Sequence, residues 1–187
     1  MAGITENDGG RRGNPWRIAV WATAAFLLLL PLIAMQFTSE VNWDETDFIV
    51  FGAMLAVACG TYELATRATS NGACRAAVGI AVAAAFILVW MNLAVGIIGT
   101  EDNPLNLMYG GVLAVAIVGS LVARFQPNGM ATAMVVTALA QASVAAIAQV
   151  AGHFTWVLTA AFVALWLGSA SLFRKAAREQ TLTRGAP

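Results

Sequence analysis

Six long apolar runs alternate with short polar links along this chain of 187 residues. A helix needs about 20 mostly apolar residues to cross the hydrocarbon core of a bilayer. The runs are too long for strands and show no alternation of period two, so helices are expected. The pattern predicts an all-α, polytopic membrane bundle with six transmembrane helices near residues 17–35, 47–66, 76–98, 105–123, 130–151 and 154–173.

Composition indicates a protein that lies almost wholly in the bilayer. The chain is 59% hydrophobic and 11% charged, whereas soluble domains are about 25% charged. Outside the transmembrane domain, 17–173, we expect a flexible cytoplasmic N-terminus, 1–16, and a basic cytoplasmic tail, 174–187. The first run has a basic flank, as a secretory signal does. It is as long as a full span and lacks a small-x-small cleavage site, so we expect it to be retained.

Basic residues occur only before the first run, in the second and fourth links, and after the last run. These positions all lie on the same side of the membrane. Cytoplasmic links keep Lys and Arg whereas translocated links lose them, so the distribution predicts that both termini are cytoplasmic. The formal net charge is zero, and the basic ends concern membrane orientation, so a nucleic-acid partner is not expected. The ten basic residues are Arg11, Arg12, Arg17, Arg67, Arg75, Arg124, Arg174, Lys175, Arg178 and Arg184.

The two cysteines predict neither a disulfide nor a cofactor site. Cys59 lies within the second run and Cys74 near the start of the third, at or near the reducing side of the membrane. Two cysteines without matched histidines make no zinc site. We therefore expect no cofactor, and the sequence leaves open whether any metal binds.

Small residues recur four apart in several runs, as in Ala56 and Gly60, or Gly79 and Ala83. Such faces let helix backbones approach closely, which drives association in lipid. The alternative is that alanine-rich runs show this spacing by chance.

A weak internal repeat relates residues 44–72 to residues 101–129. Asp44-Glu45 then matches Glu101-Asp102, and Asn71-Gly72 matches Asn128-Gly129. Parallel repeats occur in some transporters. Membrane topology alone, with acids on one side and turns on the other, gives the same spacing.

Glu63 is the one acid in the interior of a predicted span, since Asp47 lies at the very start of the second one. An ionisable group at membrane depth is a candidate for a proton or ion relay. Arg67 lies four residues later on the same helix, where the two side chains can form an ion pair. We favour the pair.

Asn92, Gln141 and Gln149 are neutral polar residues within spans. An amide exposed to lipid leaves hydrogen-bonding atoms unsatisfied, so each is expected to face another helix. Helix contact is the favoured interpretation, and a polar solute path is the alternative. His153, the lone histidine, is interpreted as a turn residue between the last two spans, with a pH-sensitive group as the alternative.

The most distinctive stretch runs from Asn92 to Pro104 and ends the third span. Gly96 and Gly99 permit a break in the helix. The acids and Asn103 supply oxygen atoms of the kind that hard cations prefer. Solvated loop acids and helix caps are favoured over an outer acidic vestibule formed by Asp44, Glu45, Asp47, Glu101 and Asp102.

The chain resembles a family of small polytopic bacterial inner-membrane proteins with no known activity. The resemblance rests on Val41-Asn-Trp43, on Tyr62-Glu-Leu-Ala65 and on the stretch from Trp90 to Tyr109. It implies a multi-pass location in the bacterial inner (plasma) membrane and assigns no residue a role.

No nucleotide-binding, serine-hydrolase or metalloprotease motif occurs in the sequence. We expect a non-enzymatic membrane protein whose partners are the bilayer and either further copies of itself or an unlike membrane subunit. The rival is a small cation or solute transporter that uses the outer acids. A membrane enzyme acting through His153 and an acid is the least favoured alternative.

Overall fold

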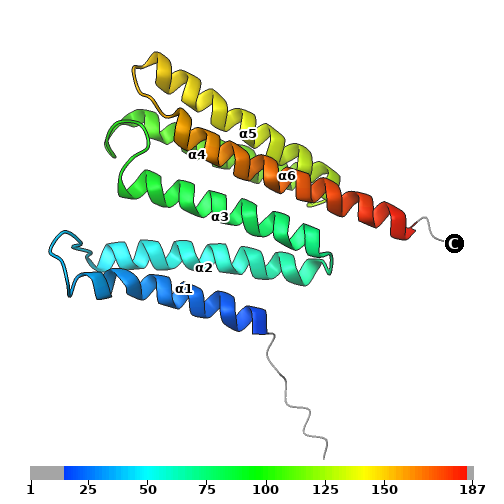
Figure 1. Cartoon of the computed structure of the whole chain (residues 1–187), viewed down its shortest axis with the longest axis horizontal. Coiled ribbons are helices and arrows are strands. Elements are labelled where there is room, and N and C mark those ends of the chain that lie inside the picture. The colour runs from blue at the N-terminus through cyan, green and yellow to red at the C-terminus, as the bar shows by residue number, and fades with distance from the viewer. Residues whose placement is uncertain (1–14, 185–187) are drawn as a thin grey trace, which may run out of the picture. The chain divides into compact units, whose positions relative to one another are not determined.

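The computed structural model describes residues 15–184, which form six α-helices and one short 3-10 helix with no strand among them (Figure 1). The predicted all-α class is therefore confirmed. Residues 1–14 and 185–187, including Arg11 and Arg12, lie outside the described part of the chain. The elements are α1 Pro15–Ala34, α2 Glu45–Ala68, α3 Gly72–Ala94, η1 Pro104–Leu107, α4 Met108–Val122, α5 Pro127–Val150 and α6 Trp156–Arg184.

Each of the six helices is long and apolar enough to cross a membrane once η1 is counted with α4. This supports a multi-pass membrane protein. Most boundaries differ from the expected spans by a few residues. Helix α3 begins at Gly72 and ends at Ala94, before two glycines with positive φ. The largest difference is in α6, which continues to Arg184 through most of the basic segment that follows the last run.

The chain divides into two compact units, with the boundary inside α2 between Cys59 and Gly60. In the first unit, α1 and α2 meet where Leu28 contacts Gly52. The ring of Trp43 packs edge-on against those of Phe48 and Phe51, with centroids 5.4 and 5.3 Å apart. Helix α1 exposes most of its large apolar side chains, as a lipid-facing helix does.

In the second unit, α6 packs along both α5 and α3, and α4 packs along α5. Six of the buried residues on each side of the α5–α6 contact recur at alternating steps of four and three, which is a heptad pattern. In α5 they are Met130, Met134, Thr137, Gln141, Val144 and Ala148. On the α6 side they are Thr155, Thr159, Phe162, Trp166, Ser169 and Phe173.

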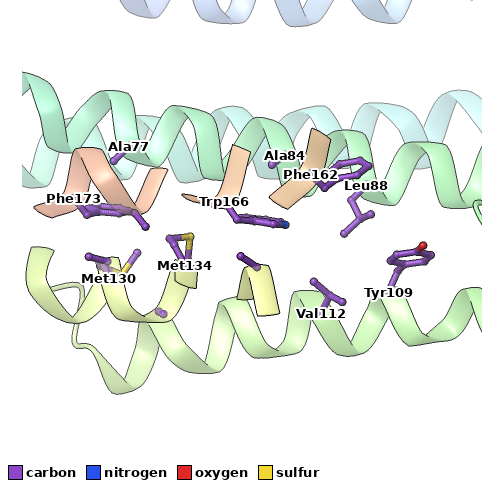
Figure 2. Close-up of a cluster of buried hydrophobic side chains, with 14 of the residues drawn as sticks. Ala77, Ala84, Leu88, Tyr109, Val112, Met130, Met134, Phe162, Trp166 and Phe173 are labelled. Atoms are coloured by element: carbon purple, nitrogen blue, oxygen red, sulfur yellow. The ribbon is translucent and has the colours of Figure 1, made fainter. Parts of the chain in front are cut away.

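The two heptad faces run antiparallel about the α5–α6 turn, where Gly152 has a φ of +86°. Positions equally distant from the turn therefore fall level with one another. Figure 2 shows one such layer, in which Met130 faces Phe173. Counting outward from the turn, the positions expected to be level are Ala148 with Thr155, Val144 with Thr159, Gln141 with Phe162, Thr137 with Trp166, Met134 with Ser169 and Met130 with Phe173.

The buried residues of α3 and α4 follow the same three- and four-residue spacing as those of α5 and α6. The face of α3 includes Ala77, Ala84 and Leu88, which are fully buried, and the face of α4 begins with Tyr109 and Val112. Ser169 of α6 donates a hydrogen bond of 2.8 Å to the Ala77 carbonyl, which joins α6 to α3. Helices α3 to α6 are thus a four-helix bundle with packing of the coiled-coil type.

Glycine sets the distance between α4 and α5. A Cβ atom added to Gly119 would lie 2.9 Å from that of Ala133, and one added to Gly129 would lie 2.7 Å from that of Ala123. Real Cβ atoms do not come so close, so only glycine permits this approach. Close contact through small residues is a main source of helix association in lipid.

Polar contacts hold the α2–α3 link to α6. The Arg75 guanidinium donates to the carbonyl oxygens of Thr66 and Thr69 at 2.9 and 2.8 Å, and so caps the end of α2. Asn71 caps α3 by accepting from the Cys74 N–H, and its amide nitrogen donates to Glu179 at 2.7 Å. The extension of α6 therefore packs on this link, where Ala176 is fully buried.

Replacing Gly119 by Ala should lower the free energy of unfolding by about 1–3 kcal/mol, because α4 and α5 must move apart. Gly111 is the matched control, since it lies in the same helix and has no neighbour within 4 Å of an added Cβ. Gly111→Ala should leave stability unchanged or raise it by up to about 1 kcal/mol. Reversible unfolding in mixed micelles measures both variants. Equal stability of the two would contradict the close approach.

Candidate functional site

One buried amide, that of Asn106 in η1, holds the link between α3 and α4 together. Its side-chain oxygen accepts hydrogen bonds from the backbone N–H groups of Ile97 and Ile98, at 3.1 and 2.8 Å. Its nitrogen donates to the carbonyl oxygens of Ile98 and Thr100, at 3.4 and 2.7 Å. The side chain is thus fully used in shaping residues 97–100.

Glycine allows the link to turn back on itself. Gly96 and Gly99 have φ values of +67° and +72°, which L side chains rarely adopt. A Cβ atom on Gly96 would also lie 2.5 Å from the carbonyl carbon of Thr100. Asn103 then caps η1 by accepting from the Leu105 N–H at 3.0 Å. The predicted helix break is present, and its role in the described chain is to position Asn106.

His153 lies against this link. The imidazole packs beside Gly99, with 3.2 Å between His153 Cε1 and a Cβ atom added to that glycine. His153 Nε2 and Asn103 Nδ2 lie 3.5 Å apart. The histidine therefore joins the α5–α6 turn to the α3–α4 link.

The candidate acids divide between the two units of the chain. Asp44 and Asp47 cap α2 reciprocally, since each side chain accepts from the backbone N–H of the other at 3.0 Å. Glu45, Glu101 and Asp102 are exposed. Within residues 15–184, no group of three or more acids, histidines and cysteines is placed to hold a metal ion.

Glu63 forms the ion pair with Arg67 that the sequence spacing predicts. The side chain of Glu63 is 13% exposed and that of Arg67 is 61% exposed, so the pair runs from the helix surface outward. This arrangement is typical of a long basic side chain, here Arg67, whose charged end extends away from the apolar region.

The three predicted amide residues have different surroundings. Asn92 donates to the Asn106 carbonyl at 3.1 Å, which ties α3 to η1, while its own oxygen is buried without a partner in the described chain. Gln141 is 1% exposed and lies on the heptad face of α5. Gln149 is exposed, so the expectation that it faces another helix is wrong within the described chain; it lies one residue before the end of α5, where its amide is not buried in the bundle.

Further buried polar atoms lie in the bundle interior, and sequence reasoning missed most of the residues that carry them. Asn106 was also missed, because it looks like an ordinary first-turn residue after Pro104. The spacing of Thr155, Thr159 and Trp166, four and seven residues apart, could have indicated that the three side chains share one face of the helix. Among the described residues, the buried side-chain atoms without a hydrogen-bond partner are Asn92 Oδ1, Tyr109 OH, Gln141 Oε1, Thr155 Oγ1, Thr159 Oγ1 and Trp166 Nε1.

Comparison of the chain with protein-family models, with curated proteins and with solved structures finds no match.

Replacing Asn106 by Ala should lower the free energy of unfolding by at least about 2 kcal/mol, because several buried backbone groups lose their partner. Amide exchange at Ile97 and Ile98 should accelerate as well. Asn128→Ala is the control, because Asn128 is exposed at the start of α5. Equal exchange at Ile97 and Ile98 in both variants would show that Asn106 does not hold the link.

Proposed function

We propose that this chain is a non-enzymatic subunit of the bacterial inner membrane that acts by associating with another transmembrane helix. One observation carries the proposal. An apolar groove of about 720 Å³ lies between α4 and α5, inside the second unit. It is lined mainly by small and β-branched residues: Ala114, Val115, Val118, Gly119, Val122, Ala123, Gly129, Thr132, Ala133 and Val136.

The groove follows from the close approach of the two helices. Because Gly119 and Gly129 carry no side chain, the surface over the α4–α5 contact is hollowed. Beside it, α4 exposes Gly110, Gly111 and Ala114, and nothing lies within 4 Å of a Cβ atom added to either glycine. A helix backbone can approach such a surface closely, whereas lipid chains gain less contact from it.

The chemistry of the lining defines the partner. The groove lining carries no charged residue, so the partner is an apolar transmembrane helix whose own face is built from small residues. A second copy of the chain and an unlike membrane subunit both have this chemistry, and the experiment below distinguishes them.

The distribution of basic residues supports the proposed orientation. All ten Lys and Arg residues lie in the two terminal segments or in the second and fourth links, which share one side of the membrane. This is expected for a protein with both termini in the cytoplasm.

Replacing Ala114 by Phe should fill the groove and reduce the recovered partner about tenfold, equivalent to about 1.4 kcal/mol of packing. Cells carrying two differently tagged copies are solubilised gently, one tag is purified, and retained membrane proteins are quantified by mass spectrometry. Recovery of the second tag indicates self-association, and a stoichiometric unlike protein indicates an accessory role.

The matched control is Ala161→Phe, at an exposed alanine of α6 outside the groove. Equal partner recovery with both variants, or purification of the parent chain without any stoichiometric partner, would contradict the association function.

A small cation or solute transporter is the second candidate. The buried, unpartnered amide oxygens of Asn92 and Gln141 favour a polar path through the bundle. If this candidate holds, replacing Glu101 by Gln together with Asp102 by Asn should reduce ion or solute flux into vesicles holding the purified protein. The control is Glu40→Gln, at another exposed acid. The association function predicts no protein-dependent flux for the parent chain or for any of these variants.

A further inference from the structure

The interior of the α3–α6 bundle contains polar atoms that the protein itself does not satisfy. Tyr109, Gln141 and Trp166 are each 1% exposed, and Thr159 is 2% exposed. Gln141 Oε1, Thr159 Oγ1 and Trp166 Nε1 have no hydrogen-bond partner among residues 15–184, and the Tyr109 hydroxyl interacts with that of Thr155 without meeting the full geometry of a hydrogen bond. A buried donor or acceptor without a partner loses its hydration and gains nothing in return, so it weakens the fold.

These atoms form a row along the bundle. On α6 and the residue before it, Thr155, Thr159 and Trp166 lie on one heptad face. Gln141 of α5 falls level with Phe162, between the layers of Thr159 and Trp166. The Tyr109 hydroxyl of α4 lies close to that of Thr155. Figure 2 shows Tyr109 towards one end of the bundle and Trp166 in its middle, with the indole nitrogen on the side towards Tyr109.

Other hydroxyls in the same bundle do find backbone partners. Thr137 donates to the carbonyl of Ala133 one turn earlier, at 2.9 Å, and Ser169 donates across to α3. Thr159 follows Thr155 by the same four residues, yet its hydroxyl makes no such bond. The unpartnered row is therefore not a general property of polar residues in these helices.

We propose that this row, from Tyr109 and Thr155 to Gln141 and Trp166, is an internal binding site for water. The indole N–H donates only, the amide oxygens accept only, and the hydroxyls do both, so the ligand must donate and accept. The buried polar residues of the described chain carry no charge, which fits a neutral ligand. Internal waters in proteins make about three hydrogen bonds each to groups of this kind.

The site goes beyond the proposed association function and does not depend on it, because the α4–α5 groove is a separate surface. A hydrated row inside a membrane bundle gives polar side chains partners that lipid cannot supply. It begins next to the α3–α4 link, because Tyr109 lies in the first turn of α4, directly after η1.

The direct test is nuclear magnetic resonance of the full chain in nanodiscs with ¹⁵N-labelled tryptophan. The Trp166 indole signal is identified by its absence from the Trp166→Phe spectrum. The proposal predicts a magnetisation-transfer cross-peak between the Trp166 indole N–H and water, although the residue is 1% exposed. A sharp Trp166 signal without that cross-peak would overturn it.

Two conservative variants test the site without changing Trp166. Tyr109→Phe and Thr159→Val each remove one hydroxyl and keep the shape of the side chain. If water binds there, each should reduce the folded-to-unfolded ratio about tenfold, because a bound water loses a partner. If the row is dry, removing the unpaired Thr159 hydroxyl should leave the ratio unchanged or raise it, which would overturn the proposal. Thr61→Val, at an exposed threonine of α2 outside the groove, is the control.

Discussion

The antiparallel heptad contact between α5 and α6 is the constraint on which the second unit depends. Alternating steps of four and three keep one face of each helix turned to the other over six successive layers, so each buried side chain has a fixed opposite neighbour. Helix α3 joins through the Ser169 hydrogen bond, and α4 joins through Gly119 and Gly129. Because lipid supplies no hydrophobic force between helices, this geometric fit and a few polar bonds must hold the bundle.

The same contact determines where the polar residues go. Gln141, Thr159 and Trp166 occupy interior positions of the heptads, so they are shielded from lipid. At the end of the bundle, the Asn106 amide organises the α3–α4 link, and His153 packs against it. The outer face of α4 and α5, by contrast, is apolar and hollowed by glycine. The polar interior and the apolar groove are therefore separate features, and we propose water binding for the first and helix association for the second.

The existence and type of the six helices follow from the sequence, because run length and hydropathy suffice for them. The Glu63–Arg67 pair also follows, since it depends only on spacing within one helix. The heptad pattern could not be seen, because positions that face lipid are as apolar as positions that face the core. Asn106 was missed for a related reason: its importance comes from Ile97 and Ile98, which fold back onto it only after Gly96 turns the chain.

The register of α5 against α6 is tested most directly by cysteine cross-linking in native membranes. Cys59 and Cys74 are first replaced by Ala, and pairs of cysteines are then introduced and oxidised. The account predicts that the level pair, Val144→Cys with Thr159→Cys, forms an intramolecular disulfide, since disulfides require Cα atoms within about 7 Å. The displaced pair, Val144→Cys with Ser169→Cys, should not form one. Equal cross-linking of both pairs, or preference for the displaced pair, would contradict the heptad register.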